Sequence, residues 1–503
     1  MAARRDELSA YTFAKKRTLA AFLRPSPSGT DEGAPAPLRA VVPSLVTAAL
    51  LLAGFGAWGM LEPKAPKGWD TPGTKVVVGK QSTTRYVVLT TGEGKDRRTL
   101  LHPVLNLASA RLLLDPRAFE VVRVDDEVLD AGHPPRGPIL GIPYAPDRLP
   151  TTDEAGRAKR WAVCAQPGGG AGAAVQKAAF VLAERDFART EDRGRKLAPG
   201  EVLYVKGQKG ALRYLVDDTG TKYLVRGAPA DAAHLATALV GVNREPQSVT
   251  DDWLATLHTG SPIDFPDVPG RVGAAAGVGG GLSATEDRVG MVLRSGTGAG
   301  PQHYVVLPGK VQPVSDFTAW LLIHSPQTQP LDMDGRPTEV DSSDFPPDAT
   351  TFGAEHRWPT GRVRQVNTTT DGEGGRDTVC SVLRAVDAKG RTTLSTWAGP
   401  EYPAEITPGG PATYVTPGSG LLYTQAREGG TGSDGSLFLV TDTGLRYAVR
   451  TNGEGPDGEI SSEAKIRLGY EDVDPGIVPV AWSDWLSKGP RLDTDGARRA
   501  QGS

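Results

Sequence analysis

Three polar residues near the start of the chain have types and spacings that could do hydrolytic chemistry. His102, Asn106 and Ser109 lie in the stretch LHPVLNLASARLLL, residues 101–114, at intervals of four and three. On a continuous helix these intervals place side chains on one face, where a histidine can activate a serine hydroxyl. The alternative is a packing element that carries polar residues.

A second copy of this stretch favours the packing interpretation. Pro-Val at 103–104 recurs at 313–314 in VQPVSDFTAWLL, and the alignment puts Gln, Asp and Ala where His, Asn and Ser stand. Pro103 also disfavours helix at the residue before it. We therefore expect Asn106 and its counterpart Asp316 to cap short helices, with Pro103 and Pro313 as packing residues of repeated units.

Nucleotide hydrolysis would need a loop of the form G-x-x-x-x-G-K-[ST], because its backbone N–H groups and lysine hold the phosphates. The sequence contains none. Lys95 in TGEGKDR and Lys310 in LPGKVQ come nearest, but the first glycine and the hydroxyl are missing, which indicates turns between strands. G-x-S-x-G and H-E-x-x-H are also absent, and two cysteines with seven scattered histidines do not predict a zinc site. We expect no catalytic, cofactor-binding or metal-binding residues.

Composition indicates which elements hold the chain together. Of 503 residues, 62 are Gly and 41 are Pro, which is typical of many turns and short strands. The net charge of -3, without a Lys and Arg run interleaved with aromatics in the C-terminal part, argues against a nucleic-acid partner. We expect an α+β fold.

The stretch AVVPSLVTAALLLAGFGAWGML, residues 40–61, contains no charged residue. As a helix it would span about 33 Å, enough to cross a bilayer. Seven basic residues against four acidic ones precede it, which predicts a cytoplasmic N-terminus and an extracytoplasmic remainder. A cleaved signal peptide or a buried core helix are the alternatives; Trp58 suits a membrane interface.

The first 38 residues combine a partly apolar helical stripe with a basic cluster, followed by a Pro, Ser and Gly-rich connector. Such a segment binds anionic lipid or docks on a cytosolic partner, or it is a basic leader that only sets topology. The residues expected to make membrane or partner contacts are Arg4, Arg5, Lys15, Lys16, Arg17, Phe22 and Trp58.

The remainder is predicted to be a duplication with a period near 220 residues. LRYLVDDTGTKYLV at 212–225 matches LFLVTDTGLRYAV at 437–449, and each predicts a β-hairpin. YVVL at 86–89 recurs at 304–307, and DDWLATL aligns with SDWLSKG, which puts Trp253 opposite Trp485 as packing residues.

Cys164 and Cys380 stand 216 residues apart, close to this period. Both lie on the predicted outer side, where oxidising conditions permit a disulfide. A bridge between equivalent positions would join the two halves across a pseudo-two-fold axis.

Several of these segments together resemble the EccB family of actinobacterial type VII (ESX) secretion systems. They are RRDELSAYTFAKKRTLAAFLRP, the single anchor, LHPVLNLASARLLL, GIPYAPDRLP followed by WAVC, and the closing VPVAWSDWLSKGPRL. The resemblance implies an inner-membrane subunit with one helix and an envelope domain of a β-rich core and four peripheral repeats. It also implies a larger oligomeric complex with an EccC-type FtsK/SpoIIIE motor ATPase, EccD and EccE.

The function expected from this resemblance is a scaffold of the membrane assembly that contacts the motor through its N-terminus. An ATP-hydrolysing subunit, as members of the family are sometimes labelled, and an envelope glycan-binding protein are the alternatives. The expected divisions are a cytoplasmic segment 1–38, a transmembrane helix 39–61, a linker 62–74, repeat 1 at 75–134, the first core half 135–205, repeat 2 at 206–268, a Gly-rich linker 269–285, repeat 3 at 286–340, the second core half 341–430, repeat 4 at 431–495 and a tail 496–503.

Overall fold

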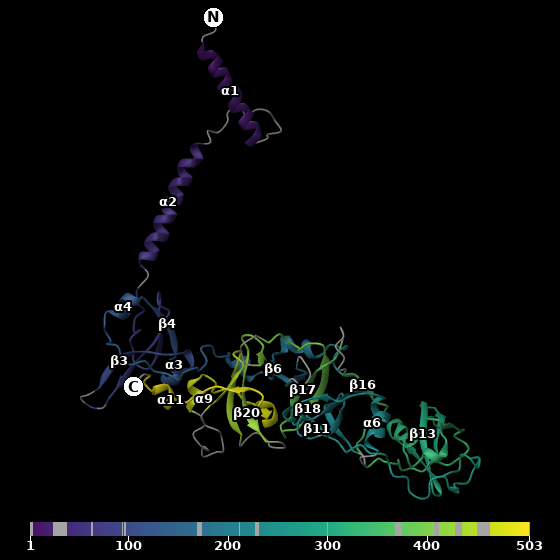
Figure 1. Ribbon diagram of the computed structural model, residues 1–503. Coiled ribbons are helices and arrows are strands. Elements are labelled where there is room, and N and C mark those ends of the chain that lie inside the picture. The colour runs from purple at the N-terminus through teal and green to yellow at the C-terminus, as the bar shows by residue number, and fades with distance from the viewer. Residues whose placement is uncertain are drawn as a thin grey trace.

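The computed structural model shows two N-terminal helices and an elongated body of five β-sheets (Figure 1). The residues it describes are 4–23, 38–61, 64–92, 94, 97–168, 174–210, 212–226, 231–298, 300–367, 375–406, 412–427, 435–449 and 463–501. The chain is thus a mixed α/β protein with multiple sheets, as its composition predicts.

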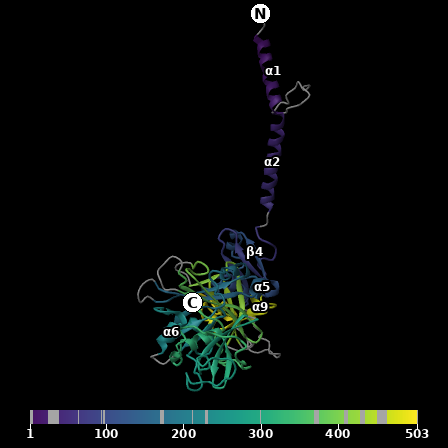
Figure 2. The same cartoon turned by 90° about the vertical axis from the view of Figure 1, so that its right-hand side faces the viewer.

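The helices α1 (Arg4–Leu23) and α2 (Leu38–Leu61) project from one side of the body in both views (Figures 1 and 2). Apolar side chains of α2 are exposed, among them Leu45, Leu52 and Phe55. Among the described residues, however, no helix reaches the length and hydropathy of a membrane span. The transmembrane helix expected at 39–61 is therefore not confirmed by the structure.

The central sheet has the strand order β18-β17-β5-β6-β19. Its middle pair, β5 and β17, is antiparallel, and each of these strands also forms a hairpin with its neighbour on the other side. The elements are α5 (Thr152–Gly156), β5 (Arg160–Gln166), β6 (Gln176–Leu182), η3 (Glu184–Thr190), β17 (Thr378–Val386), β18 (Thr392–Gly399) and β19 (Thr413–Val415).

The first and third peripheral sheets, numbered in chain order, share one topology. Each is a three-stranded antiparallel meander followed by a helix and a fourth strand that pairs in parallel with the first: β3-β2-β1-β4 and β14-β13-β12-β15. The elements are β1 (Lys75–Gly79), β2 (Arg85–Thr91), β3 (Arg98–Pro103), α3 (Leu107–Leu113), η2 (Pro116–Ala118), β4 (Glu120–Val124) and α4 (Asp126–Asp130), then β12 (Val292–Thr297), β13 (Gly300–Leu307), β14 (Lys310–Val314), α8 (Asp316–Ile323), η4 (Gln329–Leu331) and β15 (Thr338–Glu339).

The second and fourth peripheral sheets repeat this order and add a fifth strand parallel to the third: β10-β7-β8-β9-β11 and β23-β20-β21-β22-β24. In addition, β16 (Arg364–Gln365) pairs with β7. The elements are β7 (Glu201–Lys206), β8 (Arg213–Val216), β9 (Thr221–Val225), α6 (Ala232–Val240), β10 (Gln247–Ser248), α7 (Asp251–Leu254) and β11 (His258–Thr259), then β20 (Gly420–Ala426), β21 (Ser436–Thr441), β22 (Leu445–Ala448), α9 (Glu463–Arg467), β23 (Gly476–Pro479), α10 (Val480–Ser483), β24 (Ser487–Lys488) and α11 (Thr494–Arg498).

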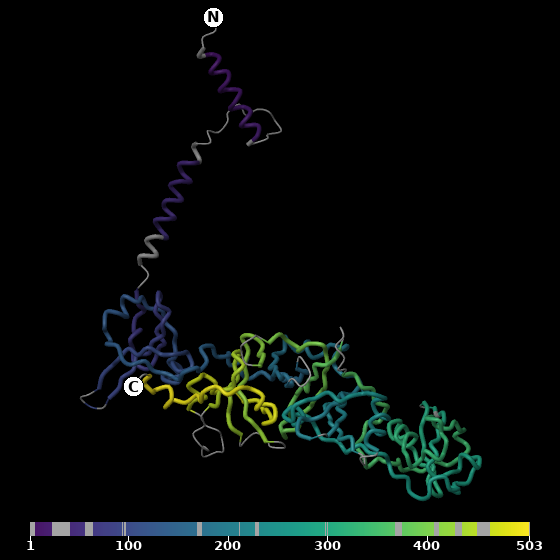
Figure 3. Tube along the Cα trace, viewed as in Figure 1, coloured from purple at the N-terminus to yellow at the C-terminus, as the bar shows by residue number. Residues whose placement is uncertain are grey.

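Along the body the sheets follow the order first, fourth, central, second, third, with the first beside α2 and the third at the far end (Figures 1 and 3). Buried residues join them in the same sequence: one apolar core is shared by the first and fourth sheets, one by the fourth, central and second sheets, and one by the second sheet and α8 of the third. The chain therefore runs out to the far end and returns.

Two segments expected to be linker or tail pack against sheets. In the Gly-rich segment 269–285, Ala276 is buried in the core of the third sheet, and Gly281 donates its N–H to the Asp344 carbonyl at 2.7 Å. Gly280 has φ +101°, and a Cβ there would lie 2.4 Å from the Asp344 oxygen, so glycine is required. Near the C-terminus, Ala497 of α11 is fully buried in the core shared by the first and fourth sheets.

Candidate functional site

The three polar residues of 101–114 do not assemble a catalytic group. His102 lies in β3, is buried, and makes a hydrogen bond of 2.9 Å through Nδ1 to the Pro138 carbonyl. Asn106 is the N-cap of α3: its Oδ1 accepts from the Ser109 N–H at 2.9 Å and from the Ser109 hydroxyl at 2.7 Å. The Ser109 hydroxyl oxygen accepts the Ile142 N–H at 2.9 Å. The serine therefore secures a loop, as the packing interpretation predicts.

The expected equivalence of Pro103 and Pro313 agrees with the strand register. Pro103 pairs with Tyr86 and Pro313 with Tyr304, each at the end of the meander. The expected cap at Asp316 is wrong by one residue. Ser315 is the N-cap, since its side chain accepts from the Thr318 N–H, and Asp316 is the first helical residue.

The expected pairing of Trp253 with Trp485 is also wrong. In α7, Trp253 is the third helical residue, three residues after the N-cap Thr250. Trp482 holds that position in α10 after β23, and both indoles are buried, whereas Trp485 is only partly buried. The sequence Asp-Trp occurs at both Trp253 and Trp485, and aligning it shifts the match by three residues. The equivalent positions are those at which the indole is buried, whichever residue precedes it.

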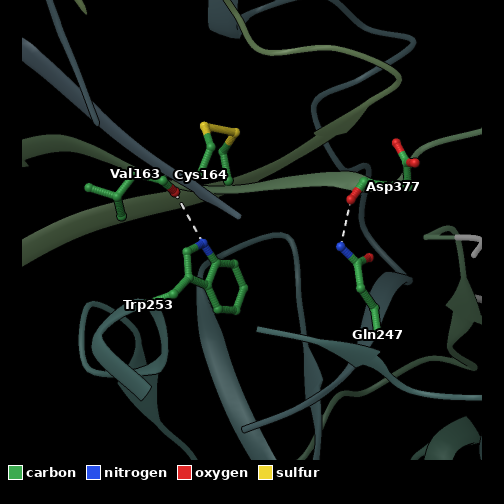
Figure 4. Close-up of a disulfide and its surroundings, with 6 residues drawn as sticks. Val163, Cys164, Gln247, Trp253 and Asp377 are labelled. Atoms are coloured by element: carbon green, nitrogen blue, oxygen red, sulfur yellow. Dashed lines mark hydrogen bonds between the residues drawn. A yellow bond between two sulfur atoms is a disulfide. The ribbon is translucent and has the colours of Figure 1, made fainter. Parts of the chain in front are cut away.

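Around the disulfide, side chains from distant parts of the sequence lie in direct contact. Cys164 of β5 and Cys380 of β17 are directly opposite in the register and form a fully buried disulfide, with Cα atoms 4.1 Å apart. This confirms the bridge expected from the sequence. On the side of β5 opposite the disulfide, the Trp253 Nε1–H donates to the Val163 carbonyl at 3.1 Å (Figure 4).

A buried amide network extends this junction. Gln247 of β10 donates from Nε2 to the Asp377 carbonyl at 2.5 Å (Figure 4), and its Oε1 accepts from Asn367 Nδ2 at 3.0 Å. Asn367 in turn accepts the Tyr204 N–H at 2.8 Å. Buried polar atoms stabilise a fold only when they are paired, so this network fixes the second sheet against the central one. No local pattern in the sequence indicates these pairs, since their members are 120 and 163 residues apart.

Charged residues gather on the disulfide side of the central sheet around Glu191. Its carboxylate contacts Arg160 Nη1 and Arg384 Nη2 at 2.6 Å each and Lys196 Nζ at 3.0 Å. Burial alone would raise the pKa of Glu191, but hydrogen bonds from Lys196 and Arg384 and the nearby positive charges outweigh it, so its pKa lies below the ordinary value. Sequence reasoning missed this cluster. It ties residues of β5, β17 and the segment after η3 together.

The residues expected to contact membrane or partner are placed only in part. Lys15, Lys16 and Arg17 are exposed on α1, and Phe22 is 90% exposed. Trp58 belongs to α2, but its side chain and those of Arg4 and Arg5 lie outside the described residues.

Of the two lysines nearest to a phosphate-binding pattern, Lys310 lies among the described residues. Lys310 is the first residue of β14, after the two-residue turn Pro308–Gly309 of a β-hairpin. Lys95 lies outside the described residues. Among the described side chains, no group of three or more His, Cys, Asp or Glu residues is arranged to hold a metal ion.

The chain is similar in sequence and in fold to known proteins. The family model described as "Type VII secretion system ESX-1, transport TM domain B" matches residues 1–503. ESX-3 secretion system ATPase EccB3 of Mycobacterium tuberculosis is 27% identical over 472 residues, covering 88% of this chain and 79% of that protein. ESX-1 secretion system ATPase EccB1 of Mycolicibacterium smegmatis is 28% identical over 317 residues, 62% of this chain and 60% of that protein.

Two solved structures share the fold. A chain of an intact ESX-5 inner membrane complex is 21% identical with a TM-score of 0.58, and the match covers 100% of this chain and 96% of that one. A chain of the EccB3 dimer from the ESX-3 core complex is 22% identical with a TM-score of 0.55, covering 84% and 100%.

Proposed function

Because the chain belongs to the EccB family of type VII secretion systems, we propose that it is a structural, membrane-anchored subunit of such a secretion complex. The observation that carries this proposal is the family match over all 503 residues. The same fold in a chain of an ESX-5 inner membrane complex supports it. In this role the sheets form an extracytoplasmic scaffold, and the energy for transport comes from another subunit.

The anchor is residues 39–61, crossing the membrane once with the N-terminus in the cytoplasm. Support comes from the uncharged stretch 40–61, from the 24-residue helix α2 and from its exposed Val42, Leu45 and Phe55. Exposed apolar side chains on a helix that projects from the body are unfavourable in water and favourable in lipid. An uncleaved anchor also explains why basic residues precede this stretch.

The body is a duplication whose halves are related by a pseudo-two-fold axis at the disulfide. In this arrangement the first and second peripheral sheets correspond to the third and fourth. The second and fourth units begin earlier than the sequence indicated, with β7 at Glu201 and β20 at Gly420 instead of at 206 and 431. The matching strand orders support this correspondence. So does the register of β5 and β17, in which Cys164 faces Cys380 while Val163 faces Ser381 and Ala165 faces Val379. An offset of 216 residues exchanges the last two pairs and leaves the cysteine pair in place.

The partners are an EccC-type motor ATPase, EccD, EccE and further copies of this chain. Contact with the motor is made by the exposed basic side chains of α1, Lys15, Lys16 and Arg17, and by Phe22. Deletion of residues 1–38 tests this contact. The truncated chain is expected to lose the motor on purification in mild detergent while the body keeps its thermal transition and its disulfide. Retention of the motor at the full-length level would contradict the assigned contact.

ATP hydrolysis is the second candidate, because the curated relatives carry the word ATPase in their names. If the chain itself hydrolyses ATP, the purified full-length protein turns over ATP with metal dependence, and Lys310→Ala or Lys95→Ala abolishes turnover. We expect no turnover above a buffer control, because the P-loop motif is absent from the sequence.

A further inference from the structure

A cleft of about 990 Å³ crosses the third peripheral sheet at the far end of the body. One row of its lining follows the register across the strands: Glu339 of β15 opposite Arg294 of β12, then His303 of β13 and Val314 of β14. The start of α8, with Ser315 and Asp316, forms another part of the lining. The row extends over four strands, so an extended ligand fits better than a compact one.

Positive charge exceeds negative charge in this cleft. Three arginines, Arg294, Arg336 and Arg362, line it together with two carboxylates, Asp316 and Glu339. Arg294 is paired with Glu339 at 2.6 Å. Arg362 is paired with Asp316 more loosely: its Nε lies 3.7 Å from Oδ1, and its backbone N–H donates to Oδ2 at 3.2 Å. Arg336 has no ion-pair partner within the described part of the chain. The Arg336 guanidinium thus remains available to an anion, and that of Arg362 is only loosely paired; their planar donors suit carboxylate and phosphate oxygens.

Two other side chains adjust the cleft. The guanidinium carbon of Arg362 lies 4.1 Å from the centre of the Trp320 ring, which holds this arginine at the edge of the cleft. Burial lowers the pKa of His303, so its imidazole is neutral near pH 7 and can donate one hydrogen bond without adding charge. The cleft then carries a net charge of about +1 from its arginines and carboxylates.

The first peripheral sheet, which shares this topology, has an apolar residue at the position of Arg294, although Arg85 and Arg123 flank it. There, Val78 stands where Arg294 stands in the third sheet, since each pairs with the residue before the tyrosine of the next strand, Arg85 or His303. Arg85 is satisfied by Asp147 at 2.7 Å. The shared topology therefore does not require an arginine at the position of Arg294.

We propose that this cleft binds the anionic groups of an extended cell-envelope polymer through carboxylate or phosphate oxygens. The choice of an envelope polymer over a lipid headgroup rests on the proposed function, which puts the body outside the membrane. The third sheet lies at the end of the body farthest from α2 (Figure 1). A lipid surface would be met by the first sheet instead.

The test is direct binding to the full-length protein in lipid nanodiscs. The probes are a glycerol-phosphate oligomer for phosphate, an oligogalacturonate for carboxylate and an uncharged glucan oligomer. We expect binding of at least one anionic probe that weakens as salt is added, and the stronger anionic probe identifies the oxygen type. Failure of both anionic probes to bind, or equal binding of the glucan, would overturn the proposal.

Matched variants locate the site. Arg336→Glu is expected to lower the affinity at least tenfold, while Arg271→Glu, at an exposed arginine outside the cleft, leaves it within twofold. Glu339→Gln frees Arg294 and removes a competing carboxylate, so it should raise the affinity at least threefold. Equal losses in the two arginine variants, an unchanged Arg336→Glu or a weaker Glu339→Gln would each contradict the assigned site.

Because Arg336 is exposed and without an ion-pair partner in the described chain, its substitution is compatible with folding, which the thermal transition checks. Since the measurement uses pure protein, it does not depend on other secretion subunits. A failure here therefore leaves membership in the secretion complex standing, and a failure to co-purify with other subunits leaves the binding result standing.

Discussion

The body has two junctions between peripheral sheets, one near α2 between the first and fourth sheets and one at the far end between the third and second sheets. Each joins a four-stranded sheet to one with an added fifth strand, but the side chains that make the contacts differ. Near α2, arginines reach across to backbone carbonyls: Arg111 Nη1 to Leu468 at 3.0 Å and Arg467 Nη1 to Leu114 at 2.7 Å. At the far junction, indoles do this, with Trp320 Nε1 to Ala238 at 2.6 Å and Trp358 Nε1 to Pro262 at 2.9 Å. Strand order is thus maintained while the side chains that couple the sheets differ.

The near junction also receives the end of the chain. Three residues near the C-terminus enter the core shared by the first and fourth sheets: Ala464 of α9, Leu468 directly after α9, and Ala497 of α11. The far junction has a smaller core built around Phe317 and Leu321 of α8. We infer that the end of the body beside α2 is the more firmly coupled one.

The largest expected effect on stability comes from removing the disulfide of the central sheet, which lies between the two junctions. Replacing both Cys164 and Cys380 with alanine removes a link that closes 216 residues, which the chain-entropy model values at about 5 kcal/mol. We expect a lower midpoint in denaturant, measured by circular dichroism. Unfolding at the wild-type midpoint would show that the halves do not depend on the bridge.

Next in size is a cavity at the far junction. Phe317 is fully buried and meets Trp358 edge-on, with ring centres 6.1 Å apart. Phe317→Ala is expected to cost about 3–5 kcal/mol in stability. Hydrogen exchange should quicken in the third sheet and remain unchanged in the first. Equal quickening at both ends would mean that the junctions unfold as one unit.

A smaller effect is expected at the near junction. Arg111 is half-buried, and burial lowers its pKa; Arg111→Leu leaves the Leu468 carbonyl without this donor. The expected loss is about 1–3 kcal/mol in the free energy of unfolding, with exchange quickening in the first and fourth sheets. Arg117→Leu, at an exposed arginine nearby, is the control and should stay near wild type. Equal losses in both variants would remove the role assigned to the carbonyl contact.

A single hydrogen bond at the far junction is worth less. Trp320→Phe keeps an aromatic ring but removes the bond to the Ala238 carbonyl, so a loss of about 1 kcal/mol is expected from thermal unfolding. Trp485→Phe is the matched control, because the buried Nε1 of Trp485 makes no hydrogen bond in the described structure. A greater loss of stability in Trp485→Phe than in Trp320→Phe would contradict the contribution assigned to the Trp320 hydrogen bond.

The smallest effect concerns the centre between the junctions and depends on pH. The pKa of Glu191 is lower in the folded than in the unfolded chain, so its ion pairs stabilise the fold above the ordinary glutamate pKa and are lost as pH falls through the folded value. Glu191→Gln should therefore lower the melting temperature at pH 7, and the difference should vanish only once the pH has fallen through the folded pKa of Glu191, which lies below the ordinary glutamate pKa. A difference that persists undiminished in acid would exclude titration of this carboxyl group.

Patterns repeated along the chain allowed much of this architecture to be predicted. The hairpins follow from alternating apolar and polar residues. The Pro-Val strand ends and the spacing of the two cysteines follow from comparing one half of the sequence with the other. The capping role of Asn106 could also be predicted, because a proline three residues earlier limits where α3 can begin.

What could not be predicted depends on residues far apart in the chain. Glu191 meets Arg384 only because β5 and β17 are neighbours, and Asn367 meets Tyr204 across 163 residues. Trp482 was overlooked because Trp485 shares the preceding Asp with Trp253, whereas only the folded helix α10 shows that the Trp482 indole is the one buried in the core. The cleft likewise requires four strands in register before its arginines come together.

The most direct measurement of the central claim is the composition of the complex that holds this chain. Full-length tagged protein, purified from its own membranes in mild detergent and analysed by native mass spectrometry, should be recovered with a motor ATPase and multispanning subunits in a large assembly. Recovery as a free, water-soluble monomer without those subunits would contradict a scaffold of the secretion membrane complex.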